Sequence, residues 1–257
     1  MNRVYYFILI LAVAFVSCSS KKQVTQPKPP NNPVAELKQA DQLLIHKRCA
    51  EAIPAYKAFL DKYPKDAQGW NSMGIAQLCD GKFQDAVTSF TQAITIAPTY
   101  SDVHNNLGIA YMELKNNQEA RNHFLKALED PQYPKVGPYY NLSKLAYTEQ
   151  QYEESRALAK KVLEFSPKET APRLVYAFSL EKLNRFDEAS VQFKEILKAA
   201  PENVEACYHL ATVLKQQNLQ CEAREYYKKV IDVDPLSDFA QKSIAAIKGL
   251  SCSKASN

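Results

Sequence analysis

Residues 70–98, WNSMGIAQLCDGKFQDAVTSFTQAITIAP, decide the fold of this chain. Small residues stand at Gly74 and Ala86, an aromatic ring follows at Phe90, and Pro98 comes at the end. Two helices can cross closely only where their side chains are small, so this spacing predicts a packed pair of helices. Proline lacks the amide hydrogen that a helix interior needs, and Pro98 therefore predicts where the second helix ends.

The same pattern recurs every 34 residues, with one additional residue near Asp130–Pro134. A period of this length is the signature of a stacked repeat array. Six copies follow one another, at 33–66, 67–100, 101–135, 136–169, 170–203 and 204–237. Position 8 of every copy is small, as Ala40, Gly74, Gly108, Ser143, Ala177 and Ala211. Position 20 is also small, as Ala52, Ala86, Ala120, Ser155, Ala189 and Ala223.

The pattern resembles the tetratricopeptide repeat, most clearly in Trp70, Gly74, Ala86, Phe90 and Pro98. The resemblance implies an all-α fold, a right-handed superhelix (α-solenoid) of six helix pairs. We call the two helices of each repeat helix A and helix B. In such a superhelix the A helices line the concave face.

Two details of the packing can be predicted from the repeat positions. We expect the aromatic ring at position 24 of each repeat to fill the gap to the next repeat. Repeat four has Ala159 at this position, and we expect Phe165 to fill part of that volume. Residues 238–257 contain a last amphipathic segment with Phe239, Ile244 and Ile247 on one side, which we expect to cap the array.

The N-terminus predicts an export signal, in residues 1–17. Arg3 precedes an apolar stretch of about 13 residues, which is too short for a bilayer span of roughly 20 residues. The stretch ends at Ser17 and Cys18, which resemble the bacterial lipobox and imply that Cys18 carries lipid after cleavage. Residues 18–32 continue as a polar, proline-rich spacer. An ordinary cleaved signal and an uncleaved anchor are the alternatives.

Five cysteines follow the spacer, and export permits disulfides. By repeat position, Cys49 and Cys221 stand at the start of a B helix. Cys79 and Cys252 stand near the end of the A helix that follows each of them, and such points are neighbours at the edge of a repeat stack. We predict the bridges Cys49–Cys79 and Cys221–Cys252 at the two ends of the array, with Cys207 as a buried thiol. The alternative is that all five thiols are unpaired.

The sequence nominates no catalytic or metal-binding residues. It contains no phosphate-binding or dinucleotide-binding glycine motif and no zinc motif, and its four histidines are dispersed. The formal net charge is only +4, with lysine and arginine scattered among acidic residues, which disfavours nucleic acid as a partner. We therefore expect no enzyme activity and no cofactor.

The concave groove is the predicted binding site. Its helix A residues carry more aliphatic and aromatic groups than a soluble face usually exposes, which favours an extended or helical partner segment. We expect the asparagines to hydrogen-bond the backbone of that partner. The alternative is that several of these side chains only pack between adjacent A helices. The predicted groove residues are Asn71, Ile75, Leu78, Asn105, Ile109, Met112, Tyr140, Tyr147, Phe178 and Tyr208.

The order of signal, lipidated cysteine, spacer, six repeats and cap resembles the pilotins of type IV pilus systems. The resemblance implies a lipid-anchored, non-enzymatic chaperone on the periplasmic face of the outer membrane. It further implies that the groove binds the secretin subunit and promotes assembly of the secretin pore. A generic periplasmic adaptor for barrel assembly or peptidoglycan synthesis, and a glycan-binding protein, are the alternatives.

Overall fold

The computed structural model describes residues 33–251, which belong to one compact unit. The predictions for the signal peptide, for Cys18 and for the spacer lie outside the described residues. Within 33–251, no helix combines the length and the apolar character that crossing a membrane requires.

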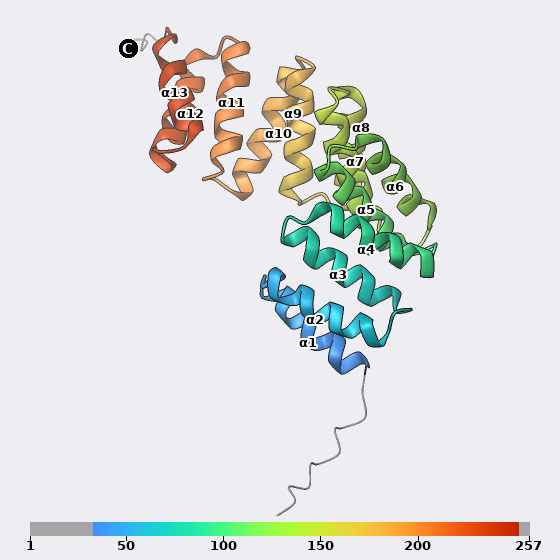
Figure 1. The fold of residues 1–257 in the computed structure, drawn as a ribbon. Helices are drawn as coiled ribbons and strands as arrows, with labels where there is room; N and C mark the ends of the chain where they lie inside the picture. The colour runs from blue at the N-terminus through green and yellow to red at the C-terminus, as the bar shows by residue number, and fades with distance from the viewer. Residues whose placement is uncertain (1–32, 252–257) are drawn as a thin grey trace, which may run out of the picture. The chain divides into compact units, whose positions relative to one another are not determined.

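Thirteen α-helices and no β-strand lie within the described part of the chain (Figure 1). The predicted all-α array of helix pairs is confirmed. The A helices begin at residues 33, 67, 101, 136, 170 and 204, where the repeat pattern begins each copy. The A helices are α1 (Pro33–Ile45), α3 (Ala67–Cys79), α5 (Ser101–Glu113), α7 (Val136–Thr148), α9 (Thr170–Lys182) and α11 (Val204–Gln216). The B helices are α2 (Cys49–Lys62), α4 (Phe83–Ile96), α6 (Asn117–Glu129), α8 (Tyr152–Phe165), α10 (Phe186–Ala199) and α12 (Gln220–Val233), and α13 (Asp238–Lys248) follows them.

Each A helix turns into its B helix through the same backbone conformation. One residue in each turn has a positive φ, and the residue after it donates its N–H back to helix A. An example is the 2.8 Å hydrogen bond from Lys82 N to Gln77 O, which is the bond that closes a Schellman motif. Glycine is the residue that adopts a positive φ most easily, yet five of the six turn residues carry side chains. The residues with positive φ at this point are Lys47, Gly81, Lys115, Gln150, Asn184 and Asn218.

In repeats two and three, the glycine at position 8 packs against the ring at position 24 of the same repeat. A Cβ atom placed on Gly108 would lie 2.4 Å from Cε1 of Phe124, and one placed on Gly74 would lie 2.5 Å from Cε1 of Phe90. Both rings are fully buried. The prediction that this ring fills the gap to the next repeat was therefore incomplete, because the ring first occupies the space above position 8 of its own repeat.

Repeat four has no ring at this point and buries hydroxyl groups instead. The prediction that Phe165 fills the missing volume is wrong, because Phe165 is 58% exposed. Ser143 and Ser155 are fully buried, and Ser155 Oγ donates a 2.8 Å hydrogen bond to Ser143 O. Ser179 Oγ lies 2.8 Å from Ser155 Oγ. Buried hydroxyls are tolerated where they are hydrogen-bonded, which explains how repeat four closes without an aromatic side chain.

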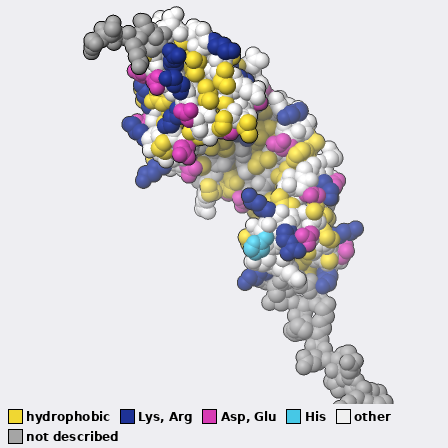
Figure 2. All heavy atoms as spheres, turned by 90° about the vertical axis from the view of Figure 1, so that its left-hand side faces the viewer, with side chains coloured by type: hydrophobic (Ala, Val, Ile, Leu, Met, Phe, Trp, Pro, Cys, Tyr) yellow, Lys and Arg dark blue, Asp and Glu magenta, His cyan; other side chains and the backbone are white. Residues whose placement is uncertain are grey.

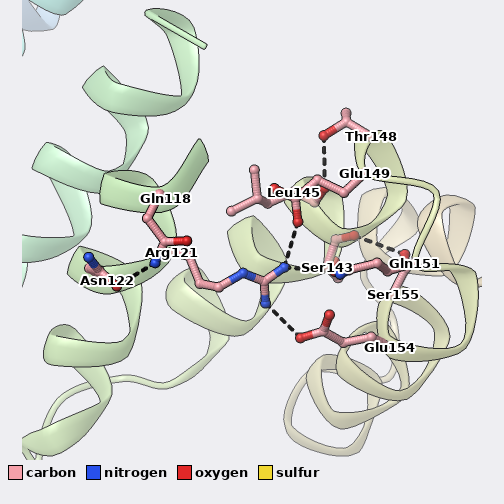
Figure 3. A network of polar contacts seen from close by, with 10 residues as sticks. All are labelled: Gln118, Arg121, Asn122, Ser143, Leu145, Thr148, Glu149, Gln151, Glu154 and Ser155. Carbon is pink, nitrogen blue, oxygen red and sulfur yellow. Dashed lines mark hydrogen bonds and ion pairs between the residues drawn. The ribbon is translucent and has the colours of Figure 1, made fainter. Parts of the chain in front are cut away.

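An arginine ties repeat three to repeat four, where the chain carries its additional residue. Arg121 of α6 reaches the turn between α7 and α8, with Nη2 2.7 Å from Glu149 Oε2 and Nη1 2.7 Å from Glu154 Oε1 (Figure 3). Nη2 also donates to Gln151 Oε1 at 2.9 Å. A planar guanidinium holds several oxygens at once, so Arg121 joins the two repeats by polar contacts.

Helix α13 covers the open end of repeat six. Phe239 and Ile247 pack against the last repeats, and Ala240 and Ser243 are buried. Ile244 is 45% exposed, so its predicted place on the packed side of the cap is wrong. At about 100° per residue, Ser243, Ile247 and Ala240 fall within about 60° of one another around the helix, and Ile244 lies at the edge of this face, about 40° beyond Ala240.

The structure joins Cys49 and Cys79, the first predicted pair, in a disulfide with Cα atoms 5.9 Å apart. Cys207 is a buried free thiol. Cys221 is disulfide-bonded, and Cys252, the partner that the sequence predicts for it, lies outside the described residues. The Cys49–Cys79 bridge therefore ties the second helix of the first repeat to the repeat that follows it.

Candidate functional site

The A helices line the inner side of the array. Each A helix packs directly on the A helix of the next repeat, whereas within 33–251 the backbones of successive B helices lie farther apart and are bridged by long side chains, as in the Arg121–Glu154 and Lys194–Glu222 ion pairs. Closer packing on one side bends an array toward that side, and the curved ribbon shows this bend (Figure 1). Figure 2 faces the hollow of the curve and shows hydrophobic side chains on its walls, with charged side chains between them.

Nine of the ten predicted groove residues are partly exposed, and only Asn71 is buried. The partly exposed side chains also pack against the core, as Ile75 does near Phe90 and Ile109 does near Phe124. The predicted role in the groove and the alternative of packing between helices therefore each describe these residues in part. Each side chain anchors its helix with one side and offers the other to the hollow.

The chemistry of the inner face changes along the array. In repeats two and three its apolar residues are aliphatic or methionine: Ile75, Leu78, Ile109 and Met112. From repeat four onward they are mainly aromatic. Tyr147, Phe178, His209, Tyr208 and Phe239 form a continuous series of ring contacts, which we call the aromatic row, with successive centroids 6.3, 4.6, 5.4 and 5.1 Å apart.

The asparagines of the inner face bond to one another, which corrects part of their predicted role. Asn106 Nδ2 donates to Asn71 Oδ1 at 3.0 Å, and Asn141 Nδ2 donates to Asn105 Oδ1 at 3.1 Å. The side-chain oxygens of Asn71 and Asn105 are therefore already used between repeats. Asn105 remains partly exposed, so its Nδ2 group is the donor best placed to meet a partner's backbone carbonyl.

Glu181 is an inner-face residue that the sequence interpretation missed. Its carboxylate Oε2 accepts a 2.7 Å hydrogen bond from Nδ1 of His209, and its side chain is only 15% exposed. Glu181 occupies position 12 of repeat five, where the preceding repeats have Leu44, Leu78 and Tyr147 in sequence register. A carboxylate at a position that is aliphatic, methionine or aromatic in the four preceding repeats was the signal available in the sequence.

A buried histidine pair joins α5 to α6. His104 Nε2 lies 2.9 Å from Pro98 O, and because a carbonyl only accepts, this nitrogen carries the proton. His104 Nδ1 is therefore the acceptor in its 3.1 Å contact with His123 Nδ1, which donates. His104 also lines an edge pocket of about 640 Å³ with Lys126, Glu129 and other residues.

The histidine pair predicts a loss of stability in acid. Burial, together with the neighbouring His104 and Lys126, lowers the pKa of His123 to about 4. Its unfolded pKa is about 6.5, so this contribution to stability is complete above pH 6.5 and is lost as the pH falls toward 4. The expected total is about 3 kcal/mol, from a shift of roughly 2.5 units. The free energy of unfolding in urea, measured at pH 7.5 and at pH 4.5, gives this loss of stability. The loss should be smaller in the His123→Gln variant. An equal loss in the wild type and the variant would contradict the prediction.

Comparison with known protein families agrees with the repeat pattern. Sequence profiles of the tetratricopeptide repeat match residues 37–101 and 178–238, residues 77–132, and residues 136–169. This chain belongs to the tetratricopeptide-repeat family.

Other tetratricopeptide-repeat structures share the fold of this repeat protein. The crystal structure of PilW, a type IV pilus biogenesis factor, superposes with a TM-score of 0.76 at 20% identity and covers 82% of this chain and 98% of PilW. Pseudomonas aeruginosa PilF superposes with a TM-score of 0.74 at 18% identity and covers 83% and 97%. Both proteins are thus matched over almost their whole solved chains.

Curated sequence relatives match this repeat protein over parts of much larger chains. The human protein O-mannosyl-transferase TMTC2 is 28% identical over 131 residues, which are 46% of this chain and 16% of the relative. This repeat protein spans less than half of each curated relative it matches.

Among residues 33–251, no group of three or more metal-ligating side chains comes together.

Proposed function

We propose that this protein is a lipid-anchored scaffold whose inner face holds a segment of another polypeptide. The observation that carries the proposal is the set of partly exposed apolar side chains on successive A helices. A monomeric surface rarely presents a contiguous apolar strip unless something covers it. An extended strand or an amphipathic helix is the kind of partner that such a strip suits.

The partner in this proposal is an outer-membrane secretin subunit, and the role is that of a pilotin. The match to PilW and PilF along almost their whole length supports it, because PilW is described as a type IV pilus biogenesis factor. The predicted lipidation of Cys18 would place the protein at the outer membrane beside the assembling pore. An unassembled pore subunit exposes apolar side chains and unpaired strand edges, and an apolar groove can shield them.

Two substitutions test the inner face. Ile109→Asp and Tyr147→Asp each place a charge among the apolar groups that the partner must cover, so we expect each to reduce secretin binding at least tenfold. Binding is measured by pull-down with the secretin, and assembly by the amount of heat-resistant secretin multimer in cells. Circular dichroism melting verifies that each variant remains folded.

The matched control is Leu125→Asp. Leu125 is 50% exposed on α6, a B helix away from the inner face, so this variant should bind as well as the wild type. Because Ile109 and Tyr147 are partly buried, Ile109→Ser and Tyr147→Ser provide milder replacements if the aspartates unfold the repeat. Normal binding by all folded inner-face variants, or normal multimers in a strain lacking the protein, would exclude the pilotin role.

A further inference from the structure

The aromatic half of the inner face contains a carboxylate in an apolar setting. Glu181 lies on α9, and its side chain is 15% exposed. The hydrogen bond that the structure gives it comes from His209, whose ring also contacts Phe178 with centroids 4.6 Å apart. A carboxylate removed from water loses solvation, and a single hydrogen bond returns only part of it.

The partner of Glu181 in this hydrogen bond need not be a cation. A neutral imidazole can donate Nδ1–H, and the carboxylate then receives no balancing positive charge from His209. Glu205 on the neighbouring α11 adds a second, partly exposed carboxylate. Burial raises the pKa of Tyr147 to about 12, and Glu181 and Glu205 contribute to the rise, so their negative potential extends to this ring.

The rings around these carboxylates attract cations as well. The face of an aromatic ring carries partial negative charge, and a lysine or arginine placed over it is stabilised. The chain itself uses this contact at both ends of the aromatic half. Lys144 Nζ lies 5.7 Å from the centroid of Tyr140, and Lys242 Nζ lies 5.5 Å from the centroid of Phe239.

We propose that repeats four to six bind a basic side chain of the partner segment, with Glu181 as its counter-charge and Tyr147, Phe178 and Tyr208 around it. Arginine fits best, because its planar guanidinium stacks on rings and bonds a carboxylate at the same time. The inference rests on the proposed function, since it assigns a chemistry to the segment held there. The partner segment then combines aliphatic residues opposite repeats two and three with a basic residue opposite repeats four to six.

The test uses two small probes, one charged and one neutral. N-acetyl-arginine amide and N-acetyl-citrulline amide have nearly the same shape, but citrulline is neutral. Each is titrated into the full-length protein while the ring signals of tyrosine and phenylalanine are followed by nuclear magnetic resonance. We expect the arginine probe to shift the signals of Tyr147 and Phe178 with a dissociation constant about tenfold lower than that of the citrulline probe.

Variants assign the effect to Glu181. Glu181→Gln keeps the side-chain shape and removes the charge, so it should weaken arginine binding at least fivefold and leave citrulline binding unchanged. Glu164→Gln removes a charge from an exposed site on α8, an outer helix, and should have no effect. Equal affinity for the two probes, or full arginine binding by Glu181→Gln, would overturn the inference.

The two proposals fail separately in these experiments. Neither probe requires a secretin, so arginine binding that depends on Glu181 supports the cation site even if secretin multimers prove independent of this protein. Conversely, Ile109→Asp could abolish secretin binding while Glu181→Gln leaves it unchanged and both probes bind equally. That result would support the scaffold proposal and exclude the cation site.

Discussion

Phe124→Ala is expected to lower the free energy of unfolding by about 3–5 kcal/mol, the range for losing a large aromatic side chain from a core. Phe124 is fully buried, and its ring fills the space above Gly108. Repeat three lies in the middle of the array, so loosening its packing weakens the interfaces with the repeats on both sides. Urea unfolding followed by circular dichroism measures the change.

The same contact predicts a reversal of sign at Gly108. In the wild type, Gly108→Ala brings a methyl group against the Phe124 ring and should cost about 1–3 kcal/mol through overpacking. In the Phe124→Ala background the ring is absent, so the same methyl group should stabilise the protein through better helix propensity and a smaller cavity. Repeat four is a natural instance of this combination, with Ser143 opposite Ala159.

The control for this series is Leu125→Ala on the same helix. Leu125 is 50% exposed, and we expect its replacement to change stability by roughly 0.5 kcal/mol or less. A loss at Leu125 as large as that at Phe124 would indicate that helix propensity rather than ring packing sets the stability of α6. Destabilisation by Gly108→Ala in both backgrounds would contradict the assigned contact.

Removal of the Cys49–Cys79 bridge is expected to cost about 3–4 kcal/mol, on the chain-entropy model for a loop of this length. The bridge spans 30 residues and ties α2 to the end of α3. Cys49→Ala/Cys79→Ala should therefore unfold from the first repeat inward, because an end repeat has a single neighbour. Hydrogen exchange should show lost protection in α1 and α2, with α9 and α10 little changed.

Reduction provides a second measurement of the same bridge. Dithiothreitol should destabilise the wild type by more than it destabilises the double variant, and the difference reports Cys49–Cys79 alone. Any remaining effect in the double variant reports the disulfide of Cys221. Cys207→Ser serves as a control for cysteine replacement, because Cys207 is a free thiol. Unchanged protection of α1 in the double variant would show that the bridge does not hold the first repeat.

The repeat architecture could be predicted from sequence because its cause is local and recurs. Position 8 must be small wherever an aromatic ring lies above it, so Gly74 and Gly108 reveal helix pairs without any knowledge of the tertiary fold. The same register predicts that Cys49 lies beside Cys79, because the start of a B helix and the end of the next A helix adjoin in a repeat stack, and the disulfide confirms it. Six repetitions of one spacing leave little freedom for another fold.

The sequence could not predict the contacts that arise where a repeat departs from the common repeat pattern. Phe165 lies close to the vacancy of repeat four in sequence, but the end of α8 holds it at the surface, and serine hydroxyls close the gap. Asn71 is at an inner-face position, yet the neighbouring repeat brings Asn106 close enough to use its oxygen.

The sequence by itself determined the helix pairs, their order and the face on which apolar residues gather, because these follow from side-chain size and spacing along one chain. Only the tertiary structure decided that His209 of repeat six meets Glu181 and Phe178 of repeat five, since the distance between residues of different repeats depends on the curvature of the array. Curvature is the sum of many small packing differences between neighbouring helices, and no single stretch of sequence contains it.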